Sequence, residues 1–376
     1  MSRNRGIVSL APMMSFTDRH FRHMMRLVSP NMTLYTEMVV ADSLVNNPRL
    51  IEQHLSHGPP GTPPMELCVL QLGGSVPTSL YQACRIVASL SNVHQYSAIN
   101  LNCGCPSKKV VRERKSNGTT SSVGFGAVLM HEPNTVAECC NAMRDGYMQG
   151  LKDIGQTGVA PPITVKHRIG TDVVSDYNSL CEFVRIVSSV GGVTHFVVHA
   201  RIAILNMKMT PKENRTIPPL NAEVVFQLAR DFPNLTFDIN GGYATVMDAF
   251  TMFDTAPNNV VGVMIGRGMT TDTWSWSQTD ALFYPESSAS GVRTRRELIT
   301  RYVEHIAAEE RQHGLKRIRR SAVRPLTSLF YGETHNCKWR EEIDRIMKSD
   351  GSCNIKDMIL RACETVTEDA LDKPYS

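Results

Sequence analysis

The side chains best suited to chemistry in this 376-residue chain lie in the stretch NLNCGCPSKKV, residues 100–110. An apolar run ends there in Asn102, and a tight Cys-Gly-Cys-Pro turn with two lysines follows. A free thiol has a pKa of roughly 8.5, so a cysteine in this turn is mostly protonated at neutral pH and can donate a proton. Nucleophilic work would need a base beside the thiol, and the turn contains no His. We therefore predict that Cys105 is a general acid, whereas Cys103 points elsewhere or is buried.

The other cysteines indicate packing rather than metal binding or disulfides. Cys103 and Cys105 lack a second ligand pair at zinc spacing, and the adjacent Cys139 and Cys140 fall within a helical pattern. The 10 cysteines include no CxxC pair, and only about ten residues precede the first motif, too few for an ordinary cleavable targeting peptide. No apolar run approaches the roughly 18–20 residues of a membrane span. We expect reduced thiols, no metal, no membrane association and a cytoplasmic or nuclear location.

Eight short apolar runs, rich in β-branched residues, must position these side chains. The runs span residues 7–14, 34–39, 68–74, 98–106, 163–170, 194–201, 235–242 and 262–268. Amphipathic segments between them span residues 18–29, 78–89, 135–148, 177–190 and 221–232. This repetition predicts an α/β fold, a (β/α)8 TIM barrel over residues 1–285. A doubly wound open sheet is the alternative.

Polar or glycine-rich clusters follow nearly every predicted strand, and a barrel would bring them to one face. Asn240-Gly241-Gly242 and Gly266-Arg267 follow the last two strands, where barrels commonly bind phosphate through backbone N–H groups. Arg267 can add charge-assisted hydrogen bonds. A phosphate-bearing cofactor is therefore predicted at this face, although tight turns alone also use such glycines.

Three further polar residues at predicted strand ends suit a flavin. A flavin ring needs amide groups along its pyrimidine edge and a cation near N1 and O2. Gln71, Lys166 and His199 supply these types at the ends of the third, fifth and sixth strands. Taken singly, Lys166 also fits a surface ion pair and His199 a core histidine.

The strand–helix alternation stops at a Ser/Gly-rich boundary, residues 286–291. Amphipathic patterns at residues 298–307, 321–330, 338–347 and 355–366 then predict a small all-α domain over residues 292–376, with a short flexible tail. Residues 293–324 hold nine Arg and one Lys against four Glu. Such a basic appendage favours a polyanion partner, and a solvated charged helix face is the simpler alternative.

Several long motifs together closely resemble the tRNA-dihydrouridine synthases. The motifs are Ala11-Pro12-Met13, Gln71-Leu72-Gly73-Gly74, Asn100-Leu101-Asn102-x-Gly104-Cys105-Pro106-Ser107, Thr164-Val165-Lys166-x-Arg168-Ile169-Gly170, His199-Ala200-Arg201 and Asn240-Gly241-Gly242. Residues 13–20, 34–39 and 210–220, with Leu329-Phe330-Tyr331-Gly332, are similar to the bacterial A-type branch. The resemblance covers residues 7–268 and continues weakly through the tail.

The resemblance implies an FMN enzyme that reduces the C5–C6 double bond of D-loop uridines, at tRNA positions 20 and 20a, with NADPH as reductant. By motif, Cys105 protonates C5 as hydride passes from the reduced flavin to C6. The residues that match FMN-binding positions are Ala11, Pro12, Met13, Gln71, Lys166, His199, Asn240, Gly241, Gly242, Gly266 and Arg267. Those that match tRNA-contacting positions are Asn102, Lys212, Arg215, Arg324 and Arg340. A monomer is expected.

The chain departs from the family pattern at three places, one of which is an extra residue before Thr210. The polar segment 112–122, which should cap the Cys105 turn, is longer than usual, and Ile202 replaces the basic residue expected after His-Ala-Arg. Two other functions remain open. One is a flavin reductase of a small pyrimidine, as in the dihydroorotate dehydrogenases. The other is an RNA-binding module that keeps the barrel without turnover.

Overall fold

The barrel predicted from the strand–helix repeat is present and closed. The computed structural model describes residues 6–47, 50–51, 67–90, 96–107, 124–205, 209–210, 212–349 and 354–374, without the side chains of 315–317. The strands are β1 (Ile7–Leu10), β2 (Thr33–Val40), β3 (Cys68–Gly73), β4 (Ala98–Cys103), β5 (Ile163–Arg168), β6 (His195–His199), β7 (Thr236–Asn240) and β8 (Val260–Ile265). Each strand pairs in parallel with the next, and β8 pairs with β1. The open-sheet alternative is therefore excluded.

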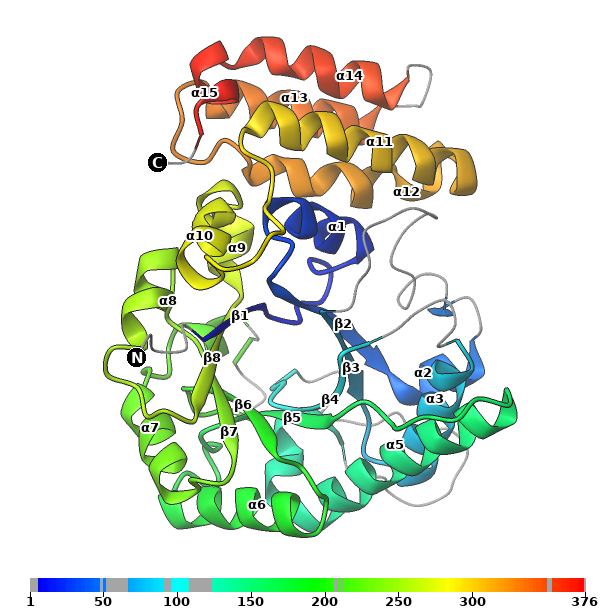
Figure 1. The fold of residues 1–376 in the computed structure, drawn as a ribbon, viewed down its shortest axis with the longest axis vertical. Coiled ribbons are helices and arrows are strands. Elements are labelled where there is room, and N and C mark those ends of the chain that lie inside the picture. The colour runs from blue at the N-terminus through cyan, green and yellow to red at the C-terminus, as the bar shows by residue number, and fades with distance from the viewer. Residues whose placement is uncertain are drawn as a thin grey trace.

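Helices surround the barrel on its outer face (Figure 1). They are α1 (Arg19–Val28), α2 (Ala41–Asn46), α3 (Pro77–Ser89), α5 (Pro133–Asp153), α6 (Tyr177–Ser189), α7 (Ala222–Asp231), α8 (Val246–Met252), α9 (Arg267–Thr271) and α10 (Thr279–Phe283). Single 3₁₀ turns add η2 (Gly126–His131), η3 (Glu213–Arg215) and η4 (Trp274–Gln278). All five predicted helices are confirmed. Their N-termini are capped where short polar side chains accept backbone N–H groups, as Asp18 does from Phe21 at 3.0 Å.

The interior of the barrel is filled by side chains. Tyr35, Val69, Val197 and Met264 form a small buried cluster inside the strands, separate from the larger core between strands and helices. Because the interior is packed, a ligand can bind the barrel only at its rim, where the carboxyl ends of the strands and their loops meet.

The C-terminal segment forms a helical bundle of α11 (Arg295–His313), α12 (Leu315–Val323), η5 (Arg324–Ser328), α13 (Asn336–Lys348), α14 (Ile355–Ala362), η6 (Cys363–Thr365) and α15 (Glu368–Asp372). The prediction of one continuous helix over residues 321–330 is wrong. Pro325 has no N–H to donate and its ring clashes with a continuing helix, so α12 ends at Val323 and a 3₁₀ turn follows. α15 was not predicted.

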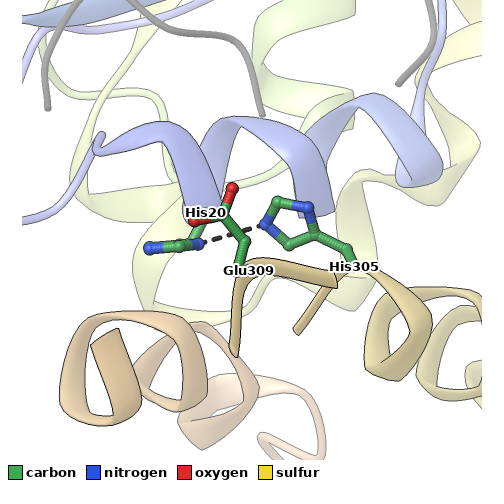
Figure 2. A group of neighbouring side chains, drawn as sticks. All are labelled: His20, His305 and Glu309. Carbon is green, nitrogen blue, oxygen red and sulfur yellow. Dashed lines mark hydrogen bonds between the residues drawn. The ribbon is translucent and has the colours of Figure 1, made fainter. Parts of the chain in front are cut away.

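The bundle packs against α1 (Figure 1), and buried polar contacts join the two. Arg19 Nε donates to Glu309 Oε2 at 2.9 Å, and His20 Nδ1 lies 3.1 Å from His305 Nε2. Figure 2 shows His20 of α1 facing His305 and Glu309 of α11. Because the three side chains are at least 95% buried, this joint fixes the bundle relative to the rim.

The basic surface of the bundle is smaller than its composition suggests. Arg295 pairs with Glu333 at 2.7 Å, Arg296 with Asp372 at 2.7 Å, and the buried Arg319 donates to Ser349 O at 2.9 Å. Much of the positive charge in residues 293–324 is therefore used within the protein. Arg293, Arg311 and Arg320 remain exposed.

No helix in the described ranges is long and apolar enough to cross a membrane.

Candidate active site at the rim of the barrel

The Cys105 turn is shaped by the last polar side chain of β4. Asn102 Oδ1 accepts hydrogen bonds from the backbone N–H groups of Gly104 at 3.2 Å and Cys105 at 3.0 Å. Local bonding of this kind is what asparagine favours in turns. The chain leaves the strand in one defined direction, and Cys105 comes to lie at the rim.

A ladder of side-chain hydrogen bonds holds Asn102 in turn. Asn102 Nδ2 donates to Gln71 Oε1 at 2.9 Å, and Gln71 Nε2 donates to Asn100 Oδ1 at 2.8 Å. Asn100 Nδ2 then donates to Thr164 Oγ1 at 2.9 Å. The ladder crosses β3, β4 and β5 inside the barrel, so the buried Gln71 and Asn102 orient the Cys105 turn.

The two thiols of the turn lie in different environments. Cys103 is fully buried in the hydrophobic core, which confirms the prediction that it is buried. Cys105 is partly exposed. Burial raises the pKa of the Cys105 thiol above its ordinary value, although Arg168, Arg215 and Lys166 pull it down. The thiol is therefore protonated at neutral pH, as a general acid requires.

Arg168 is a positioning residue that sequence reasoning did not single out. Its Nε donates to Gly104 O at 3.1 Å, and its Nη1 donates to Ile202 O at 2.8 Å and Asn214 O at 3.1 Å. The side chain is 2% exposed and ties the Cys105 turn to the segments after β6. Its motif, Lys166-x-Arg168, was visible in the sequence, but no pattern could show that its partners are backbone carbonyls.

Lys166 lies close to Cys105, and both Lys166 and His199 lie beside Asn240 at the end of β7. Lys166 Nζ donates to Asn240 Oδ1 at 2.9 Å, and Asn240 Nδ2 donates to Met264 O at 2.8 Å. Burial, assisted by Arg168, lowers the pKa of Lys166 to about 7. Burial and the surrounding cations hold the pKa of His199 well below its ordinary value, so the imidazole is neutral. The site therefore holds a neutral imidazole, that of His199, and an amine, that of Lys166, which an anionic ligand would favour in its protonated form.

The glycines after β7 and β8 form a cradle that other residues would fill. Gly241 has φ +110° and Gly242 has φ +94°, conformations that favour glycine. A Cβ on Gly241 would lie 2.7 Å from His199 Cδ2, and a Cβ on Gly266 would lie 3.3 Å from Met13 Sδ. Backbone can therefore approach a ligand closely here, as phosphate binding requires.

Ala11, Pro12 and Met13 complete the rim between β8 and β1. Ala11 N donates to Ile265 O at 2.7 Å, which extends the pairing of β1 with β8 past the end of the strand. Ala11 is buried, whereas Pro12 and Met13 are partly exposed at the rim. Arg267 is exposed beside them.

The predicted substrate loop after β6 presents two cations. Thr210 N and Oγ1 both donate to Glu213 Oε2 at 2.7 Å, and Asn214 Nδ2 donates to Ile204 O at 2.9 Å. These bonds fold and anchor η3, which leaves Lys212 and Arg215 exposed. Arg267 Nη2 donates to Arg215 O at 3.0 Å, so the loop lies against the end of β8.

Not all predicted substrate residues lie at this rim. Arg324 and Arg340 line a groove between the barrel and the bundle. Lys108 and Lys109 lie outside the described residues, and so does the segment 112–122, for which we predict a capping role over Cys105.

The residues at the rim suit a flavin mononucleotide. The cradle of Gly241, Gly242 and Gly266 with Arg267 fits the phosphate, and Lys166 offers the cation that a reduced, anionic ring needs. Fold and site together define a (β/α)8 barrel whose rim joins a protonated thiol to a cationic, glycine-lined cradle.

Comparison with known proteins identifies the family. A profile of the dihydrouridine synthase (Dus) family matches residues 9–366. The chain is 38% identical to the tRNA-dihydrouridine(20/20a) synthase of Synechocystis over 89% of this chain and 88% of that protein. It is 35% identical to the Shigella flexneri enzyme of that name over 95% and 93%, and 41% identical to the Escherichia coli K12 enzyme over 70% and 65%. The chain belongs to the dihydrouridine synthase family.

Proposed function

We propose that the protein reduces the C5–C6 double bond of D-loop uridines in tRNA, at positions 20 and 20a, with FMN as cofactor and NADPH as reductant. The protonated Cys105 thiol, held at the rim near Lys166, carries this proposal. Membership of the family, with relatives named for the 20/20a positions, supports the choice of substrate.

Bound FMN would supply the hydride for C6 of the uracil ring. Lys166 and Gln71 would hold the ring, and the Gly241–Gly242 cradle with Arg267 its phosphate. Addition at C6 places negative charge on C5 and O4, and Cys105 donates its Sγ proton to C5. Asn102 and Arg168 keep that thiol aimed at the rim.

The target uridine is stacked in folded tRNA and must be flipped out to reach such a rim. Lys212 and Arg215 on η3 would hold the surrounding backbone by its phosphates. A polyanion partner accounts for exposed cations on both η3 and the bundle.

The test is a two-step assay with purified protein. Anaerobic NADPH should reduce the bound FMN, and unmodified tRNA should then reoxidise it with formation of dihydrouridine, measured by mass spectrometry. Cys105→Ala should leave FMN reduction intact and slow reoxidation by about 10²- to 10⁴-fold. Cys337→Ala, at an exposed cysteine in the bundle, is the control.

The outcomes separate the alternatives. Protein that does not take up FMN would refute the proposal. Turnover of free uracil or orotate in place of tRNA would indicate a small-pyrimidine reductase. Tight tRNA binding without flavin reoxidation would indicate a non-catalytic RNA-binding module.

A further inference from the structure

A second candidate binding surface lies beside the rim, in a groove between the barrel and the helical bundle. One wall comes from Phe16, after β1, and from Thr270 in α9, and the other from η5 and α13. The groove has a volume of about 410 Å³. Small-ligand sites span roughly 300–1,000 Å³, so this space suits a ligand such as one nucleobase with its sugar.

Exposed aromatic rings mark the groove. Among the exposed large apolar side chains of the described residues, the aromatic ones are Phe16, 49% exposed, and Tyr331, 53% exposed. Both line this groove. Aromatic rings held in water at a basic surface are the usual platforms for unstacked bases of RNA.

The backbone holds Phe16 outward at some conformational cost. Ser15, just before it, has φ +64°, a left-handed conformation that is uncommon for residues other than glycine. Ser15 N donates to Glu37 Oε1 at 2.5 Å, and the N–H groups of Phe16 and Thr17 both donate to Met13 O at 3.0 Å. This turn fixes the direction of Phe16 before any ligand arrives.

Two arginines give the groove the charge that a nucleic acid needs. Arg324 Nη2 pairs with Asp18 Oδ2 at 2.9 Å, and its guanidinium carbon lies 5.6 Å from the Phe16 ring centroid. Arg340 is exposed and has no ion-pair partner among the described residues. One cation therefore supports the aromatic platform, and the other is available for a phosphate.

The wall from the bundle also carries polar atoms without partners. Thr327 Oγ1 and Asn336 Oδ1 are buried, and neither has a hydrogen-bond partner among the residues that the structure describes. Both residues line the groove. Buried polar atoms are normally hydrogen-bonded, so these two atoms mark a polar part of the wall whose hydrogen bonds are not satisfied among the described residues.

We propose that the groove binds a second, unpaired nucleobase of the tRNA, one that neighbours the target uridine, stacked on Phe16 and Tyr331 with its phosphate near Arg340. This rests on the proposed function. The subsite is separate from the one that receives the target base, and it fixes the register of the loop relative to Cys105.

Binding of unmodified tRNA to the FMN-loaded protein tests the proposal without relying on turnover. Phe16→Ala and Tyr331→Ala should each weaken tRNA affinity by about 5- to 100-fold, the usual range for a lost base stack. Tyr331→Phe keeps the ring and should bind as the unchanged protein does. Val159→Ala, at a residue 86% exposed and just before β5 at the opposite end of the barrel, is the matched control.

A tRNA with an abasic residue beside the target uridine identifies the occupant. Its affinity should fall by a similar factor, and Phe16→Ala should then cause no further loss. Unchanged affinity in both aromatic variants overturns the proposal. So does a changed KM for NADPH with unchanged tRNA affinity, which would assign the groove to the dinucleotide. If no dihydrouridine forms but the variants still lose affinity, the proposed function fails and the groove assignment stands.

Discussion

Replacing Arg168 tests whether the proposed acid, Cys105, depends on a side chain that donates to backbone carbonyls of three separate segments. Arg168→Met keeps much of the apolar stem and removes the guanidinium. Three backbone carbonyls then lose their donor: Gly104 O at 3.1 Å, Ile202 O at 2.8 Å and Asn214 O at 3.1 Å. Arg168→Lys keeps the charge, but one ammonium cannot repeat the planar fork of a guanidinium.

The expected loss of unfolding free energy in Arg168→Met follows from these three hydrogen bonds. A hydrogen bond to a charged group contributes about 1.5–3 kcal/mol, so three strictly additive bonds would give about 4.5–9 kcal/mol. Water can reach the rim once the side chain is gone, which lowers the expected loss of unfolding free energy to about 2–4 kcal/mol. A displacement of the Cys105 turn by about 1 Å would cost about 10²-fold in the protonation step.

Three measurements check the reasoning. Urea unfolding gives the stability, tRNA-driven flavin reoxidation gives the protonation step, and iodoacetamide alkylation gives the state of the thiol. Because Arg168 lowers the pKa of Cys105, its removal should raise that pKa and slow alkylation at a fixed pH. NADPH-driven flavin reduction should stay within a few-fold of the unchanged protein. Normal reoxidation and normal alkylation in a folded Arg168→Met variant would refute the positioning role.

Three further outcomes are expected. The pKa of Lys166 is lowered to about 7 and an anionic ligand should raise it, so FMN binding to the apoprotein at pH 8 should take up protons. Calorimetry in two buffers of different ionisation enthalpy measures this uptake, and its persistence in Lys166→Met would contradict the assignment. Gly241→Ala combines strain at φ +110° with a close contact, so it should weaken FMN binding at least 10-fold in a fluorescence titration. The control is Gly158→Ala, where the atom nearest to an added Cβ is 3.5 Å away, and it should leave FMN binding unchanged. His20 and His305 are buried and neutral with pKa values well below 6.5, so the stability that they support is complete above pH 6.5 and is lost as pH falls below it. Urea unfolding at pH 7.5 and 5.5 should show this loss, and His305→Phe should reduce the difference.

The barrel could be predicted from the sequence because its signal is repeated. Each strand has its own apolar run and polar end, so an error in the bounds of one strand would not have changed the predicted fold class. The helix over 321–330 failed for a local reason, since the amphipathic pattern outweighed the effect of Pro325. The period of the apolar residues predicts that a helix forms, whereas the residue at which the helix ends depends on single side chains such as Pro325.

The reactive groups of the site were easier to predict from the sequence than the contacts that orient them. The thiol of Cys105 is visible as a residue type, and so is the amine of Lys166. The role of Arg168 depends on carbonyls from three separate segments, and no spacing in the sequence encodes such contacts. The net charge of residues 293–324 overstates the exposed positive charge for a related reason, because the partners of Arg295 and Arg296 come later in the chain.

The ladder from Thr164 through Asn100 and Gln71 to Asn102 has a consequence for how this protein can be altered. The side chains that orient the Cys105 turn stand on strands, whereas the exposed cations that we propose as RNA contacts stand on η3 and the bundle. A graft of η3 from a relative would therefore replace the proposed RNA contacts Lys212 and Arg215 and leave the Cys105 turn in place. A graft of the Cys105 turn alone would transfer the thiol without the side chains of Gln71, Asn100 and Thr164 that orient it. The exposed cations of η3 can thus be exchanged in this scaffold without changing the side chains that orient the Cys105 thiol.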